Sequence, residues 1–171
     1  MPSPASSSAC PGCGAVLPDV AGPTHAYIGA SPACWLRYGE LLAREYSSVA
    51  PWEAHGLSVD TYAVQHPGVR THRATQSVAL HLVALGSRFE RGGDEQQRLW
   101  LLREGASRPP SGLVWLTPPE AYDLTVVDVL ERDPDEHREA VERWAQHTWR
   151  AWHEHHAQVR RWLDELLGRR R

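Results

Sequence analysis

The sequence predicts an all-α fold, an irregular bundle of four to five helices with an N-terminal loop that is stapled to it by zinc. Two observations predict the bundle. Signals that start a helix precede stretches with apolar residues at helical spacing, and no repeat or sustained heptad indicates a coiled coil. A third observation predicts the staple, because all three cysteines lie in the first 34 residues of the 171.

The chain divides into a short tail and one domain in this prediction. Residues 1–9 are small and rich in serine and proline, and we expect them to be mobile. Residues 10–171 are long enough for a single helical domain with a buried core. Its first part, residues 10–34, carries the cysteines in a segment rich in glycine and proline, so we expect a loop that is held by something other than a core.

Local signals predict the first two helices. Ser31-Pro32 supplies an N-cap and a first-turn proline for a helix that runs to about Ser47. Ser58 can cap a short second helix over residues 59–66, and the following Pro67-Gly68 would stop it.

Two further helices are expected in the middle of the chain. Residues 72–91 carry an apolar stripe at positions i, i+4, i+7 and i+11, and Gly92-Gly93 ends this helix. The stripe consists of Val78, Leu82, Leu85 and Phe89. Residues 94–104 are expected to form the next helix, and a proline-rich connection follows.

The last third of the chain predicts a short helix and a long one. Thr125, with Asp128 three residues later, indicates a helical turn or two. Asp133-Pro134 then provides an N-cap and a first-turn proline. Because no glycine or proline follows before Leu167, we expect one continuous helix over residues 134–167.

Charge and composition exclude several partners and mechanisms. The formal net charge is -3, so we expect neither nucleic acid nor a membrane surface as a partner. The chain has no lysine, which excludes a Schiff-base lysine and a P-loop lysine. We find no export signal and no membrane-spanning run. We therefore expect a cytoplasmic protein whose partner is an unidentified small molecule or protein.

The cysteines and one histidine have the spacing of a zinc site. Cys10, Cys13, His25 and Cys34 form the pattern C-x2-C-x11-H-x8-C, which offers four ligands for one tetrahedral zinc ion. The glycines of the Cys-Pro-Gly-Cys-Gly turn let backbone N–H groups point at the sulfurs. Cys34 lies in the first turn of a predicted helix, where the helix dipole favours a thiolate.

Two other interpretations of the cysteines exist. A thioredoxin-like redox pair would follow a strand and open a helix, and the residues before Cys10 do not predict a strand. The cysteines could also be unligated and without a role. A closed site with four protein ligands is normally structural, and structural zinc is the interpretation that we favour.

Histidines outside this cluster suggest a second metal site. His66, His81 and His156 lie on the predicted inward faces of three helices. Imidazoles that converge from separate helices bind transition metals, and three of them leave a position open for water. Asp60 is then a ligand or a general base, and His55 is a further candidate ligand. The alternative is that each inward histidine is a hydrogen-bonded core residue.

The residues therefore leave two functions open. The first is a small metal-binding protein with a structural Cys3His zinc site, acting as an accessory or binding module. The second is a metal-dependent enzyme of hydrolase or transferase type, with a second divalent metal bound in the bundle. A redox or metal-handling protein that uses the cysteines themselves is a third possibility.

Three stretches resemble an uncharacterised family of small bacterial proteins. They are Cys10-Pro11-Gly12-Cys13-Gly14, the segment from His25 to Trp35, and Val59-Asp60-Thr61-Tyr62-Ala63-Val64-Gln65-His66-Pro67-Gly68. The resemblance covers nearly the whole chain, from Cys10 to Leu166. It implies that the cysteine cluster and the set of Asp60, His66, His81 and His156 occur together. A weaker likeness, at the level of the fold only, is to DinB-like metal-binding helix bundles.

Overall fold

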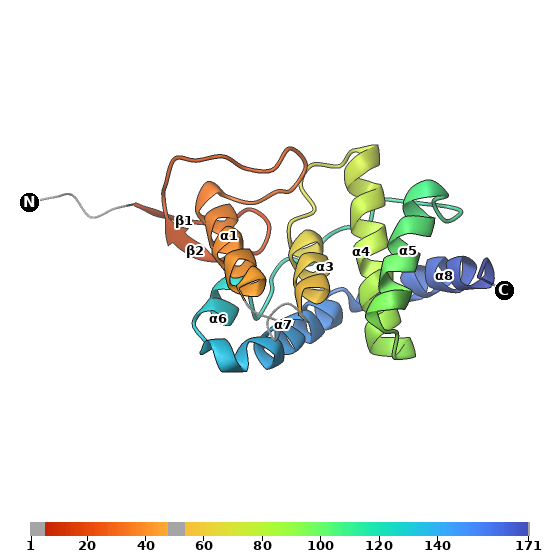
Figure 1. The fold of residues 1–171 in the computed structure, drawn as a ribbon. Helices are drawn as coiled ribbons and strands as arrows, with labels where there is room; N and C mark the ends of the chain where they lie inside the picture. The colour runs from red at the N-terminus through yellow and green to blue at the C-terminus, as the bar shows by residue number, and fades with distance from the viewer. Residues whose placement is uncertain (1–5, 48–53, 171) are drawn as a thin grey trace, which may run out of the picture.

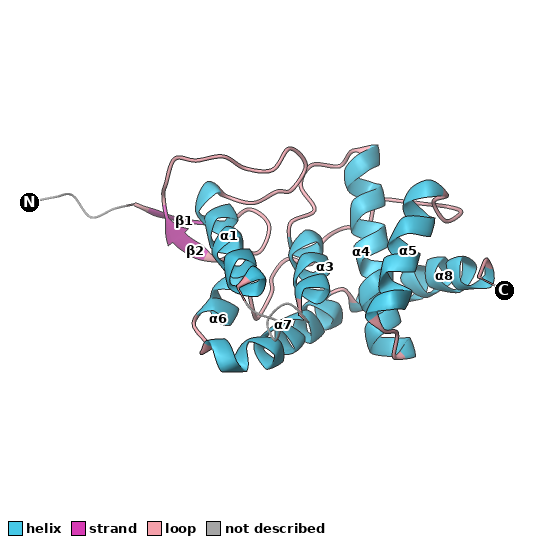
Figure 2. Cartoon of the chain, viewed as in Figure 1, coloured by secondary structure: helices cyan, strands magenta, loops and turns pink. Residues whose placement is uncertain are grey.

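The computed structural model describes residues 6–47 and 54–170. Within these residues the chain forms seven α-helices and a single two-stranded sheet, so the all-α class is confirmed, with more helices than the four or five expected. The two short strands and α1 lie at one end of the molecule, α8 lies at the other end, and α3 stands between them (Figure 1). Helices account for most of the ribbon (Figure 2).

The N-terminal end is a small hairpin followed by a long loop and a helix. Strand β1 (Ser7–Ala9) pairs antiparallel with β2 (Val16–Pro18). Residues 7–9, which we expected within a mobile tail, therefore form a strand, because the turn after them brings β2 alongside. Residues 1–5 lie outside the described residues. Helix α1 (Pro32–Tyr46) begins with Ser31 as its N-cap, as predicted.

The three central helices are α3 (His55–Gln65), α4 (His72–Arg91) and α5 (Glu95–Ser107). The bounds predicted for α4 are confirmed. The Thr71 side chain accepts a hydrogen bond from Ala74 N at the start of this helix, and Gly92 ends it with a φ of 64°, in the left-handed region that glycine tolerates. Helix α5 begins one residue later than expected, with Asp94 as its N-cap, and continues three residues past the expected end.

The start of α3 differs from the prediction. The helix begins at His55, so Ser58 is an interior residue and not the N-cap. The Ser58 hydroxyl instead donates to the buried carboxylate of Glu45 on α1. A tertiary hydrogen bond has therefore replaced the local capping bond that the sequence suggested.

The C-terminal third begins with the predicted short helix. Helix α6 (Val126–Leu130) has the expected capping box, in which Thr125 N donates to Asp128 and the Thr125 hydroxyl caps the helix. A 3-10 turn, η1 (Pro134–Glu136), leads into α7 (His137–Ala151).

The single long helix predicted over residues 134–167 is wrong. Helix α7 ends at Ala151, and after the 3-10 turn η2 (His153–His155) the chain continues as α8 (His156–Gly168). Contacts between residues on the two sides of the break stabilise it. The His156 ring stacks on Trp149, and its Nε2–H donates to the Trp149 carbonyl at 2.9 Å, a carbonyl at the end of α7.

Buried apolar side chains form two clusters. One packs α4, α5 and α8 together with the end of α7. We call α4, α5 and α8 the helical body. The other lies among the hairpin, α1, α6 and the start of α7. We call residues 6–47 the N-terminal lobe. Leu57 and Tyr122 contact both clusters. Leu57 lies on α3, and α7 contributes buried residues to both clusters, so these two helices connect the two cores.

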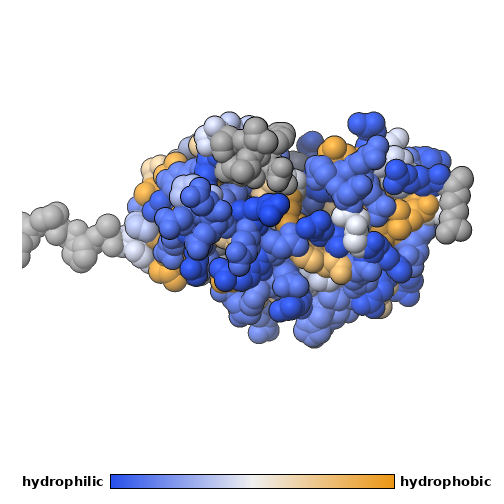
Figure 3. Space-filling view, turned by 60° about the horizontal axis from the view of Figure 1, so that its bottom comes forward, coloured by the Kyte–Doolittle hydropathy of each residue, from blue (hydrophilic) through white to orange (hydrophobic). Residues whose placement is uncertain are grey.

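The stripe predicted on α4 belongs to the core of the helical body. Val78, Leu82 and Leu85 are buried, and Phe89 packs against the same cluster. On the surface, hydrophilic side chains predominate, with apolar ones visible near the centre of the face in Figure 3. Among the described residues, no helix is long and apolar enough to cross a membrane.

Candidate metal centre

Four metal-ligating side chains meet where the N-terminal lobe contacts the end of α3. Cys10, Cys13, Cys34 and His66 each offer one ligand atom, and these four atoms all lie within 4.8 Å of one another. We call the turn from Cys10 to Cys13 the knuckle. Cys10 and Cys13 are 2% and 3% exposed, and Cys34 and His66 are 0% exposed. The structure therefore brings together a buried Cys3His group that could hold a metal ion.

The spacing of the donor atoms fits a tetrahedral zinc ion. Zinc–sulfur bonds of about 2.3 Å and zinc–nitrogen bonds of about 2.0 Å place two sulfurs about 3.8 Å apart, and a sulfur and a nitrogen about 3.5 Å apart. The Cys13 and Cys34 Sγ atoms are 3.8 Å apart, and Cys34 Sγ lies 3.3 Å from His66 Nε2. All three cysteines are free thiols in the structure.

The knuckle lies in the turn of the hairpin. Cys10 N donates to the carbonyl of Ala15 and Gly14 N donates to the carbonyl of Cys10, each at 2.9 Å. Gly14 has a φ of 80°, which favours glycine at this position. A strand does precede the two cysteines, contrary to our expectation, but the chain after them enters β2 and not a helix. The arrangement required for a thioredoxin-like pair is therefore absent from this part of the structure.

The first turn of α1 supplies the third sulfur. The Ser31 hydroxyl accepts a hydrogen bond from Cys34 N at 3.2 Å, which fixes the start of the helix. The backbone N–H of Ser31 donates a hydrogen bond to Cys10 Sγ at 3.4 Å. One capping residue thus holds Cys34 in place and stabilises the sulfur of the knuckle.

The fourth donor comes from the end of α3. His66 is the C-cap residue of that helix. Its Nδ1–H donates to the carbonyl of Tyr62 at 2.8 Å, one helical turn earlier. This bond places the proton on Nδ1 and leaves the lone pair of Nε2 directed at the sulfurs. The imidazole is therefore held in the tautomer that a metal ligand needs.

Glycines allow three backbone segments to approach at the site. A Cβ on Gly12 would collide with the His66 ring and lie 2.7 Å from the carbonyl oxygen of Gln65 and 2.8 Å from that of Gly29. A Cβ on Gly29 would lie 2.7 Å from the Cα of Gly68. The knuckle, the loop before α1 and the turn after α3 therefore touch one another where only glycine fits.

Hydrogen bonds among the three cysteines shift their pKa values in opposite directions. Hydrogen bonds from Cys13 and Cys34 lower the pKa of Cys10. The same bonds raise the pKa of Cys13 to about 11 and raise the pKa of Cys34 well above its ordinary value. A divalent cation between the three sulfurs would favour the ionised form of each of them.

His25, the nitrogen ligand that we predicted, does not belong to the group. Its ring packs on Tyr27 and Trp35 with centroids at 4.4 and 5.5 Å, and its Nδ1 accepts a hydrogen bond from Tyr27 N at 3.5 Å. His66 takes its place, because α3 carries that ring into the cluster from a segment 32 residues beyond Cys34. The signal that could have identified it is the Pro67-Gly68 turn, whose glycine lies against the loop beside the knuckle.

The second metal site that we predicted does not assemble among the described residues. Its three histidines lie in three different environments. His66 belongs to the cysteine cluster, His81 contacts Asp60, and His156 stacks on Trp149 with its Nδ1 3.7 Å from Glu90.

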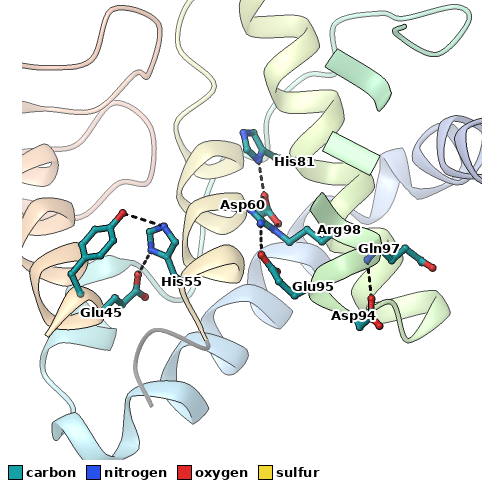
Figure 4. Close-up of polar contacts among 9 residues, drawn as sticks. Glu45, His55, Asp60, His81, Asp94, Glu95, Gln97 and Arg98 are labelled. Atoms are coloured by element: carbon teal, nitrogen blue, oxygen red, sulfur yellow. Dashed lines mark hydrogen bonds and ion pairs between the residues drawn. The ribbon is translucent and has the colours of Figure 1, made fainter. Parts of the chain in front are cut away.

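Asp60 and His81 do lie together, but within residues 6–47 and 54–170 no third metal-ligating side chain joins them to form a metal site. The His81 Nδ1–H donates to Asp60 Oδ1 at 2.7 Å, and Arg98 of α5 binds the same carboxylate through Nε at 2.5 Å and Nη2 at 3.0 Å (Figure 4). Asp60 is 1% exposed. Its charge is therefore balanced by Arg98, and the contact joins α3, α4 and α5.

A cleft of about 680 Å³ lies beside this ion pair. Side chains of α3, α4, α5 and α7 line it, among them Asp60 and Arg98. Arginines and carboxylates both contribute to the lining, so the cleft does not present a single sign of charge.

His55, the further candidate ligand, belongs to a second buried polar group. Its Nδ1–H donates to Glu45 at 2.8 Å (Figure 4), and His137 Nε2–H donates to the same carboxylate at 3.0 Å. The Ser58 hydroxyl is the third donor. Glu45 is fully buried, so this group is a hydrogen-bonded link between α1, α3 and α7.

Comparison with known proteins identifies a family. A family model described as a family of unknown function, DUF5946, matches residues 8–153. The matched part contains all four residues of the Cys3His group. Curated proteins and solved structures give no match. The motif resemblance and the fold-level likeness to DinB-like bundles stay predictions. Because the match covers most of the chain, the protein belongs to the DUF5946 family of unknown function.

Proposed function

We propose that this protein binds one structural zinc ion through Cys10, Cys13, Cys34 and His66, and that it acts as an accessory or binding module. One observation carries the proposal: four buried donors from three separated segments lie within 4.8 Å of one another. Three thiolates and one imidazole in a tetrahedral arrangement are a typical zinc ligand set. The partner of the module is an unidentified small molecule or protein.

The burial of the ligands supports a structural role. A catalytic zinc site keeps one position open for water, whereas here the protein supplies four ligands and each is at most 3% exposed. A zinc ion would supply positive charge for the three sulfurs and tie the knuckle, α1 and α3 together. Because much of the N-terminal lobe is loop, the free energy of zinc binding would contribute directly to its folding.

The geometry does not support the alternative of a metal-dependent enzyme. That function needs His66, His81 and His156 to converge, and in the structure they lie in three separate environments. Asp60, its candidate base, is bound by Arg98 through two nitrogens. We therefore propose no catalytic step.

Metal analysis of two matched histidine variants tests the proposal. We expect one zinc per chain in the purified protein and in His25→Ala, because His25 lies outside the cluster. We expect His66→Ala to bind zinc at least 10-fold more weakly and to unfold at a lower temperature, because one ligand is lost. Elemental analysis and thermal unfolding with and without a chelator measure both effects.

Two results would contradict the proposal. One is a protein without zinc whose stability a chelator leaves unchanged. The other is a loss of zinc in His25→Ala with retention in His66→Ala. Binding of a second equivalent of metal that depends on His81 would revive the enzymatic alternative.

A further inference from the structure

The three sulfurs of the cluster receive different hydrogen bonds. A backbone N–H group serves the first of them, because Ser31 N donates to Cys10 Sγ at 3.4 Å. Such N–H groups stabilise thiolates in a folded turn. Cys34 stands on a helix, and its own N–H is directed to the Ser31 hydroxyl. A hydrogen-bond donor for the Cys34 sulfur therefore has to come from another part of the chain.

Tyr62 of α3 is in position to do this. Its hydroxyl lies 3.5 Å from Cys34 Sγ, within the range of a hydrogen bond to sulfur. The same residue accepts the Nδ1–H of His66 through its carbonyl at 2.8 Å. Its ring stacks on the His66 ring with centroids 4.0 Å apart and on the Tyr38 ring with centroids 3.8 Å apart. Tyr62 is 1% exposed.

We propose that Tyr62 is a positioning residue of the metal centre, which orients His66 through its backbone and ring and hydrogen-bonds the Cys34 sulfur through its hydroxyl. The proposal rests on the zinc site proposed above and deepens it. A hydrogen bond to a metal-bound thiolate withdraws electron density from the sulfur, so it strengthens retention of the ion and weakens the sulfur as a nucleophile. Tyr62 therefore keeps Cys34 an inert ligand.

A pair of matched variants isolates the hydroxyl. Tyr62→Phe and Tyr38→Phe each remove one oxygen from the same buried aromatic stack, and only the first removes a donor to sulfur. We expect Tyr62→Phe to bind zinc 10- to 100-fold more weakly in competition with a chelator, which is the usual effect of losing an outer hydrogen bond. We expect Tyr38→Phe to stay within about 3-fold of the unaltered protein.

Two further measurements separate a positioning role from a merely structural one. In the cobalt-substituted protein, Tyr62→Phe should shift the thiolate-to-cobalt charge-transfer band, and Tyr38→Phe should leave it in place. In the zinc-loaded protein, iodoacetamide should alkylate Cys34 several-fold faster in Tyr62→Phe than in Tyr38→Phe, as read by mass spectrometry.

A third protein keeps the test decisive if Tyr62→Phe does not fold. Replacing Tyr62 by 3-fluorotyrosine retains the ring and makes the hydroxyl a stronger donor, so the charge-transfer band should shift in the opposite direction. Equal zinc affinity, equal cobalt spectra and equal alkylation rates in the variants would overturn the role of Tyr62 while leaving the zinc site intact. Failure of the unaltered protein to bind zinc would overturn the zinc site itself.

Discussion

The N-terminal lobe and the helical body are held together in different ways. In the helical body, α4, α5 and α8 enclose a continuous cluster of leucine, valine and tryptophan side chains. The N-terminal lobe has one helix and a hairpin of two three-residue strands. Residues 19–31, which join the hairpin to the helix, form neither helix nor strand. Its buried centre includes three cysteines that meet a histidine from α3.

This difference indicates what each region needs in order to fold. Apolar burial supplies the body with a stabilisation that is proportional to the area removed from water. A loop rich in glycine loses much conformational entropy when it is ordered and buries few large side chains in return. A metal ion bound to ligands from three segments can offset that cost. The comparison makes three predictions, from the largest expected effect to the smallest.

Removal of zinc should unfold the lobe and spare the body. After chelation, or in Cys34→Ser, we expect hydrogen-exchange protection to fall in residues 6–47 while α4 and α8 stay protected, since their core contains no ligand. Mass spectrometry of exchanged peptides measures this. Simultaneous loss of protection in both regions would show that the two cores are not separate units.

Truncation in the body should cost stability without affecting the metal. Leu85 is fully buried in the cluster of the helical body. We expect Leu85→Ala to lower the free energy of unfolding by about 2–5 kcal/mol. Zinc content should remain at one per chain. Denaturant unfolding and elemental analysis on the same sample test both statements, and a loss of zinc would contradict the division into two regions.

A methyl group at the knuckle should perturb the metal centre. We expect Gly12→Ala to destabilise the protein by about 1–3 kcal/mol and to weaken zinc binding, because the new Cβ would overlap with His66 and with two carbonyl oxygens. Gly39→Ala is the control. Gly39 lies in α1 with open space around its Cα, so alanine there should stabilise the helix by up to about 1 kcal/mol.

An equal response of the two variants would contradict the close packing at the knuckle. Thermal unfolding of zinc-loaded samples compares them directly.

Local signals predicted many of the elements. The N-cap at Ser31, the capping box at Thr125 and the glycine after Arg91 all act within one helical turn, so the sequence alone reveals them. The gathering of the three sulfurs was also predictable, because the two segments that carry them are close in sequence.

What the sequence did not predict depends on contacts that reach beyond one helical turn. His25 was the nearest nitrogen donor in sequence, but His66 reaches the cluster because α3 packs beside the N-terminal lobe. The break after Ala151 lacks a glycine or proline, and the stacking of His156 on Trp149 stabilises it. Ser58, predicted as an N-cap, lies inside α3 and donates a hydrogen bond to the buried carboxylate of Glu45 on α1. In each case a contact beyond one helical turn outweighed a local preference.

The most direct test of the metal centre is X-ray absorption spectroscopy at the zinc edge of the purified protein. We expect one zinc per chain with three sulfur ligands at about 2.3 Å and one nitrogen ligand at about 2.0 Å. His66→Ala should change the nitrogen shell, and His25→Ala should leave the spectrum unchanged. A protein without zinc, or a shell of nitrogen and oxygen ligands with fewer than three sulfurs, would contradict the account.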